Sequence, residues 1–152
     1  MRAATLAMFA CLALAGCARR PPPATEVEGT VYLDNQPLPN ARVEFIPELE
    51  GFGAELYSHA VTDDRGRYKL AFTYTEQPGA VVATHRVVVS DPPPPREARG
   101  VDGQSQEKLT QFLGALKNRP IPENYGSAVK TPLLVEVSAE KKTYDLHLSR
   151  AN

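Results

Sequence analysis

The stretch VEGTVYLDNQPLPNARVEFIP, residues 27–47, decides the fold class. In its first part every second residue is apolar or small, and polar side chains alternate with them. A period of two is typical of a β-strand with one buried face. The alternation stops at residues rich in turn formers and resumes over 41–45. These two segments predict a β-hairpin. The inward positions are Val27, Gly29, Val31, Leu33, Ala41, Val43 and Phe45.

Five more segments predict strands, so the whole pattern indicates an all-β domain. They cover residues 54–62, 67–72, 84–90, 132–137 and 141–149. The sequence DDRG at 63–66 predicts a tight turn between two of them, with Gly66 in a positive-φ position. About seven short strands separated by turn signals are typical of a β-sandwich. We therefore expect one β-sandwich domain over residues 26–150.

One segment interrupts the strand pattern between Asp91 and Thr131. It contains four consecutive prolines and then the sequence SQEKLTQFLGALKNRP. Four large apolar residues fall there at i, i+3, i+4 and i+7, which predicts a short amphipathic helix over residues 104–117, before the sixth strand. We expect this helix to pack on the sandwich, and the alternative is that its apolar stripe docks a partner. The stripe comprises Leu109, Phe112, Leu113 and Leu116.

The N-terminal segment predicts export. Residues 3–15 carry no charge, but the run is too short to cross a bilayer. It ends in Leu-Ala-Gly-Cys, residues 14–17, which resembles the bacterial lipobox. That resemblance implies a signal peptide over 1–16 and a lipid on Cys17. The prolines that follow at 21–23 predict an extended, proline-rich tether over 17–25. Ala18 weakly favours the outer membrane. The alternatives are an ordinary secretory signal with a chance cysteine and an uncleaved cytoplasmic start.

Composition excludes several classes of site. The formal net charge is −1 and no basic stripe is present, so we expect no nucleic-acid partner. The two cysteines are Cys11, in the predicted signal peptide, and Cys17. The predicted domain therefore has no cysteine for a disulfide, a thiolate nucleophile or a zinc thiolate site. We expect no cofactor.

The order of the motifs resembles a known family. VEGTVYLDNQPLPNARVEFIP, AVTDDRGRYKL and IPENYGSAVKTPLLVEVSAEKKTYDLHL are together similar to small bacterial lipoproteins with a transthyretin-like, or carboxypeptidase regulatory-like, domain. The likeness covers most of residues 27–149. Asn35 and Asn40 stand where that family usually has glycine, and asparagine also tolerates left-handed conformations. The resemblance implies a prealbumin-like sandwich at the cell envelope but no established activity.

No catalytic or metal-binding pattern is evident. His59, His85 and His147 fall on three different predicted strands, without metal-ligand spacing. Asp63 and Asp64 lack the remaining positions of a calcium loop, so a turn explains them better. In the IPENY motif we expect Tyr125 to pack against the sheet and to bond the backbone, rather than to bind a ligand.

These observations lead to a functional expectation. We expect a lipid-anchored envelope protein with a non-catalytic interaction domain, whose partners are the membrane, through Cys17, and an envelope protein or polysaccharide. The alternative is a module that binds carbohydrate or peptide, for which exposed aromatic residues are candidates. A hydrolase with a site not visible in the sequence is third. The aromatic candidates are Tyr32, Phe52 and Tyr57.

Overall fold

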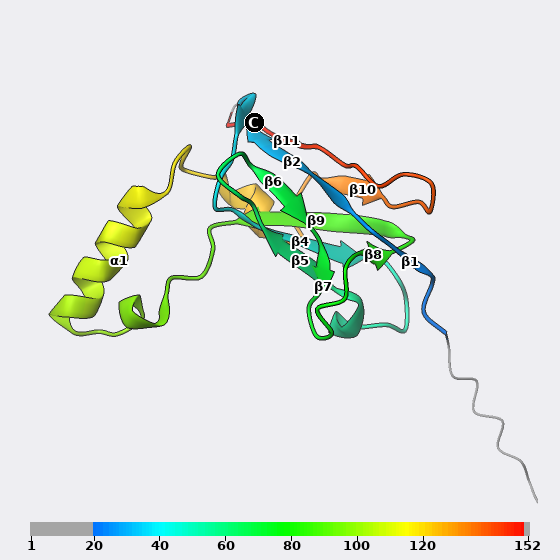
Figure 1. Cartoon of the computed structure of the whole chain (residues 1–152), viewed down its shortest axis with the longest axis horizontal. Helices are drawn as coiled ribbons and strands as arrows, with labels where there is room; N and C mark the ends of the chain where they lie inside the picture. Colours follow the sequence, from blue (N-terminus) through cyan, green and yellow to red (C-terminus); the bar gives the residue numbers. More distant parts are fainter. Residues whose placement is uncertain (1–19, 151–152) are drawn as a thin grey trace, which may run out of the picture.

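The computed structural model describes residues 20–150 (Figure 1). The predicted signal peptide over 1–16 and the lipidation site Cys17 lie outside these residues. Strands in several sheets are the main regular structure of the described chain, which also contains one α-helix. The all-β class predicted from the alternating pattern is therefore confirmed.

The largest sheet has five antiparallel strands. Strand β9 lies near its middle and pairs with both β4 and β10, so its side chains are buried on the inner face. The strands in sheet order are β10 Leu134–Glu136, β9 Thr84–Ser90, β4 Arg42–Pro47, β5 Ser58–Val61 and β7 Ala71–Phe72.

The second sheet is built around β2, which has antiparallel neighbours and one parallel neighbour, the C-terminal strand β11. A separate antiparallel pair joins β1 to β8. The strands of the second sheet are β2 Glu28–Leu33, β3 Gln36–Pro37, β6 Arg67–Lys69 and β11 Leu146–Leu148. The separate pair consists of β1 Ala24–Thr25 and β8 Ala80–Val81.

Residues 27–47 do not form the predicted hairpin. Asp34 and Asn35 have φ values of 52° and 63°, which makes the two-residue turn that returns β2 into the short β3. The chain then leaves this sheet, and β4 pairs in the other sheet with β5 and β9. The inward positions were predicted correctly, because a period of two fixes the buried face. It does not fix the pairing partner, so the hairpin prediction was wrong.

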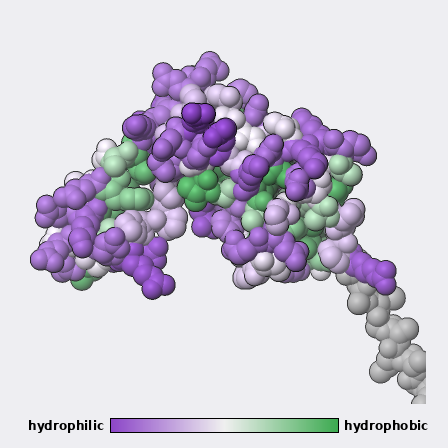
Figure 2. All heavy atoms as spheres, viewed as in Figure 1, coloured by the Kyte–Doolittle hydropathy of each residue, from purple (hydrophilic) through white to green (hydrophobic). Residues whose placement is uncertain are grey.

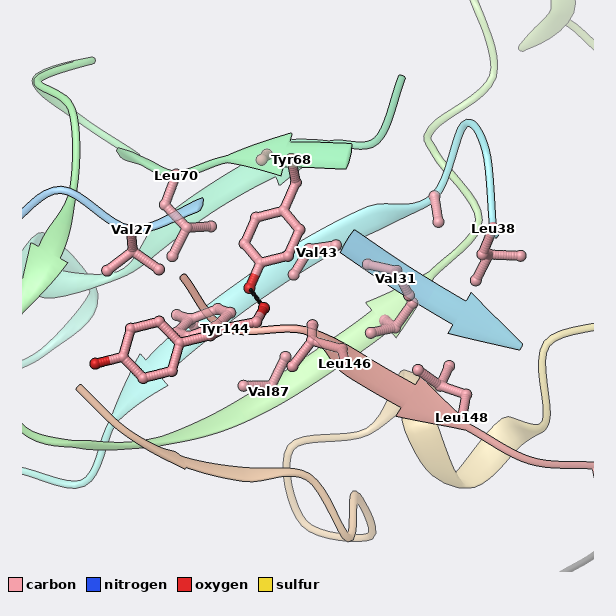
Figure 3. Close-up of a cluster of buried hydrophobic side chains, with 14 of the residues drawn as sticks. Val27, Val31, Leu38, Val43, Tyr68, Leu70, Val87, Tyr144, Leu146 and Leu148 are labelled. Atoms are coloured by element: carbon pink, nitrogen blue, oxygen red, sulfur yellow. Dashed lines mark hydrogen bonds between the residues drawn. The ribbon is translucent and has the colours of Figure 1, made fainter. Parts of the chain in front are cut away.

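Side chains from both larger sheets meet in one hydrophobic cluster (Figure 3). Phe45 on β4 is fully buried, and its ring lies 6.1 Å from that of Tyr68 on β6. The Tyr68 hydroxyl donates a 2.6 Å hydrogen bond to the carbonyl oxygen of Tyr144, next to β11. All members of the cluster lie between Val27 and Leu148, so residues 20–23 are not part of it.

The predicted helix forms, but its predicted packing was wrong. Helix α1 spans Gly103–Ala115, and Asp102 is its N-cap, because the Asp102 side chain accepts a hydrogen bond from the Ser105 N–H. None of its residues is buried, and it packs against η2 rather than on either sheet. In Figure 1 it stands away from the strands. Helical periodicity identifies an apolar stripe, but it does not say what the stripe faces. The 3₁₀ helices are η1 Ala54–Leu56, η2 Arg96–Ala98 and η3 Glu123–Gly126.

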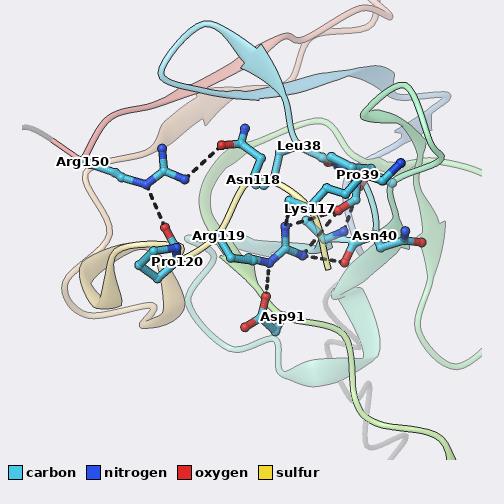
Figure 4. Close-up of polar contacts among 11 residues, drawn as sticks. Leu38, Pro39, Asn40, Asp91, Lys117, Asn118, Arg119, Pro120 and Arg150 are labelled. Atoms are coloured by element: carbon cyan, nitrogen blue, oxygen red, sulfur yellow. Dashed lines mark hydrogen bonds and ion pairs between the residues drawn. The ribbon is translucent and has the colours of Figure 1, made fainter. Parts of the chain in front are cut away.

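Arg119 fixes the base of the segment that carries α1 (Figure 4). Its guanidinium forms an ion pair with Asp91, at the other end of that segment, and donates to the carbonyl oxygen of Asn40 at 2.8 Å. The Arg119 side chain is only 13% exposed. Nearby, the Asn118 side-chain amide donates to the carbonyl oxygen of Leu33 at 3.2 Å. Both ends of the segment are therefore held at the loop that follows β3.

Candidate functional site

An open groove lies over strands β2 and β6. Its volume is about 530 Å³. The side chains that alternate outward from the two strands form its walls, because the inward-pointing ones are buried in the core. Thr143 closes one side, since it forms a bridge with Glu28 just before β11. The groove is lined by Glu28, Gly29, Thr30, Asp63, Arg67, Tyr68, Lys69 and Thr143.

The charges of the groove occur in pairs of opposite sign. The Lys69 ammonium lies 3.2 Å from a carboxylate oxygen of Glu28, and the Arg67 guanidinium lies 2.8 Å from one of Asp63. Hydrogen bonds from the Arg67 backbone and side chain, together with one from the Arg65 N–H, lower the pKa of Asp63. Both pairs are well exposed, so each contributes little to stability. Breaking such an ion pair costs little free energy, so either of its charged groups can bind a charged group of a ligand instead.

A second hollow of about 380 Å³ continues the groove, because both are lined by Glu28 and Lys69. It adds a third ion pair, in which the Lys142 ammonium lies 3.0 Å from a carboxylate oxygen of Glu26. The hydrogen bond from Lys142 lowers the pKa of Glu26. We call the two hollows together the paired-charge groove.

The floor of the groove is the close contact between β2 and the chain entering β11. Gly29 is buried, and a Cβ placed on it would lie 2.6 Å from the carbonyl carbon of Tyr144. Only glycine permits this approach. Burial raises the pKa of the Tyr68 hydroxyl, which therefore stays protonated and donates to Tyr144. The floor is thus a fixed structural element beneath exchangeable surface charges.

The aromatic candidates for carbohydrate binding do not form a platform. Tyr32 projects from the outer face of β2, but its ring stacks on that of His147, with centroids 5.0 Å apart and planes at 9°. One face of Tyr32 is therefore already covered. Phe52 and Tyr57 are half-buried on and beside the connection between β4 and β5, and neither lines the groove.

The structure keeps the three histidines apart. His147 is on β11, while His59 lies on β5, where its Nδ1 is 3.4 Å from the Thr73 hydroxyl. His85 is fully buried, and its Nε2 lies 2.9 Å from the carbonyl oxygen of Val81. Burial lowers the pKa of His85, and its Nδ1 has no hydrogen-bond partner. Among residues 20–150 no group of three His, Cys, Asp or Glu side chains could hold a metal ion.

The other residues singled out in the sequence have structural roles. Asp63 accepts from the backbone N–H groups of Arg65 and Arg67 at 2.9 Å, and Gly66 has a φ of 75°, so DDRG is the predicted turn. Tyr125 is buried, and its hydroxyl accepts from the Ser149 N–H at 3.0 Å. Both predictions are confirmed.

The sequence does not predict the paired-charge groove. Alternation predicts strands at β2 and β6, but Lys142 and Thr143 lie more than a hundred residues after β2. Their proximity to β2 follows from its parallel pairing with β11, which no pattern in the sequence predicts.

Comparisons with protein-family models, with curated proteins and with solved structures find no match to this chain. Over the part that the structure describes, no helix is both long and apolar enough to cross a bilayer.

Proposed function

We propose that this protein is a lipid-anchored lipoprotein of the bacterial cell envelope, and that its domain is a transthyretin-like β-sandwich with a non-catalytic binding role. The sequence Leu-Ala-Gly-Cys, residues 14–17, supports the anchor, and the shared core of two sheets supports the sandwich. The proline-rich stretch after Cys17 then separates the domain from the membrane. The domain faces the periplasm or the exterior, on the outer membrane where there is one.

The paired-charge groove is the observation that carries the binding role. Its cations and anions already neutralise one another, in the pairs Lys69–Glu28, Arg67–Asp63 and Lys142–Glu26. A ligand with charges of both signs can replace these partners one by one. A peptide has such charges, whereas a neutral polysaccharide does not, and the covered face of Tyr32 offers little for sugar stacking. A peptide segment of an envelope protein is therefore the proposed ligand.

Mass spectrometry of the intact protein tests the anchor. Protein extracted from its native membranes should have a mass that begins at Cys17 and includes acyl groups. A Cys17→Ser variant should lose this modification. An unmodified N-terminus in the wild-type protein would refute the anchor.

Site-directed crosslinking tests the groove. With Cys17 acylated, the mature chain has no other thiol, so a Thr143→Cys variant offers one attachment point for a photo-crosslinker inside the groove. The matched control is Val129→Cys, at a residue that is 88% exposed and does not line the groove. Envelope proteins captured from residue 143 but not from residue 129 would support the proposal. Equal capture at both residues, or none at either, would refute it.

A further inference from the structure

Helix α1 and the loops on either side of it form an arm over residues 92–118, whose apolar surface is only partly covered by the fold. Leu109, Phe112 and Leu116 are half-buried. No side chain of α1 is buried, and Leu113 is 48% exposed. Val101, between η2 and α1, is 98% exposed. Figure 2 shows apolar residues on the surface of the arm, open to solvent. A helix of 13 residues is marginally stable in water by itself, so α1 would be stabilised by a surface that buries its apolar stripe.

The charges beside the stripe indicate the nature of that surface. With 3.6 residues per turn, Lys108 lies at the edge of the stripe, whereas Glu107 lies on the opposite face. Lys117 directly follows Leu116, at the end of the stripe. The other acidic residues of the arm are Glu97, on η2, and Asp102, which is held at the helix N-terminus by its bonds to Ser105. Lysines beside an apolar stripe, with an acidic residue on the opposite face of the helix, are typical of helices that bind at an anionic lipid interface.

The position of the arm is compatible with a nearby bilayer. Seven residues connect Cys17 to Pro23, and in a polyproline conformation they span about 20 Å. A lipid on Cys17 therefore holds the domain within a short distance of the membrane. In Figure 1 the start of the described chain and α1 both extend toward the lower side of the strands, at opposite ends of the molecule. Arg119 and Asp91 fix the base from which the arm projects.

We propose that the arm is a second membrane contact, in which the stripe of Leu109, Phe112, Leu113 and Leu116 binds an anionic lipid surface. This inference rests on the proposed lipid anchor, because the anchor is what brings the arm to a membrane in the cell, whereas added vesicles offer the arm a membrane directly. Two attachment points at the two ends of the domain restrict its orientation, so the paired-charge groove is presented to partners in a defined direction.

Vesicle co-sedimentation tests the arm separately from the anchor. The protein is used from Ala18 onward, since it then lacks Cys17 and the apolar residues 3–15 but keeps the entire core. We expect it to bind vesicles of phosphatidylcholine with phosphatidylglycerol more strongly than vesicles of phosphatidylcholine alone, and less strongly as salt is raised. Leu113→Asp should lower the partition constant at least tenfold. The control Leu134→Asp, at a 58% exposed residue of β10, should leave it unchanged.

A second pair of variants tests the charge. Lys108→Glu should weaken binding to the anionic vesicles, whereas Lys130→Glu, with the same charge change on an exposed residue outside the arm, should have a much smaller effect. Equal binding by the wild-type protein and Leu113→Asp, or no binding to either kind of vesicle, would overturn the proposal. So would a dimer in solution that Leu113→Asp abolishes, because the stripe would then bind a second copy. These outcomes leave the mass measurement on Cys17 unaffected, so the two proposals fail independently.

Discussion

Replacing Gly29 with alanine should strongly destabilise the domain, because the added Cβ has no room. The new Cβ would overlap the carbonyl oxygen of Tyr144 and lie 3.1 Å from Cε1 of Tyr68. Both neighbours are held in place, the first by backbone bonds between β2 and the chain before β11 and the second by its buried ring. The strain cannot be relieved by the rotation of a flexible side chain, so the backbone must move.

The size of the effect follows from three contributions. Overpacking a core position costs about 1–3 kcal/mol, and a backbone clash belongs at the upper end. Displacing Tyr144 also breaks its hydrogen bond with Tyr68, which costs about 1 kcal/mol. Alanine lowers the entropy of the unfolded chain and returns about 0.7 kcal/mol. The free energy of unfolding should therefore fall by about 3 kcal/mol.

Urea unfolding of the protein from Ala18 onward, followed by circular dichroism, measures this difference. With a slope of about 1.5 kcal/mol per molar urea, the midpoint should fall by about 2 M. Gly126→Ala is the matched control, since a Cβ there meets nothing within 4 Å, and its midpoint should stay within about 0.5 M of the wild type. Tyr68→Phe removes the hydrogen bond alone and should cost about 1 kcal/mol. A Gly29→Ala midpoint as close to the wild type as that of the control would refute the contact between β2 and Tyr144.

Three further predictions concern other parts of the fold. Burial holds the pKa of His85 below its ordinary value of 6.5, so the contribution of the neutral His85 to stability is complete above pH 6.5 and declines as the pH falls below it. The thermal unfolding temperature should therefore fall with decreasing pH in this range, and His85→Leu should reduce that pH dependence. Arg119→Ala should lower the free energy of unfolding by about 2 kcal/mol in urea titrations, and Arg119→Lys should have an intermediate effect because lysine lacks the planar guanidinium. Equal free energies of unfolding for the two variants would contradict the role given to the bonds of Arg119 with Asp91 and Asn40. Tyr125→Phe should cost about 1 kcal/mol by the same measurement and should increase hydrogen exchange at the Ser149 amide, and unchanged exchange there would disprove the bond.

The sequence determined the buried face of the strands over residues 27–47. Val31, Val43 and Phe45 are inward as predicted, because alternation in a strand admits only two faces and the apolar one is buried. Local chemistry also determined the turns, since Asn35 and Gly66 adopt the positive φ values that their residue types favour. The helix was predicted for the same reason, as its signal repeats within four residues along the chain.

Only the tertiary structure decided which strands pair and what the helix faces. The parallel pairing of β11 with β2 brings Lys142 and Thr143 to Glu28, and this pairing creates the candidate site. Alternation carries no information about the partner, because any strand with an apolar face satisfies the same pattern. The position of α1 likewise depends on Arg119, whose bonds to Asp91 and Asn40 join residues far apart in the chain. Local patterns thus fixed which side chains are buried, whereas long-range hydrogen bonds fixed where the strands and the arm lie.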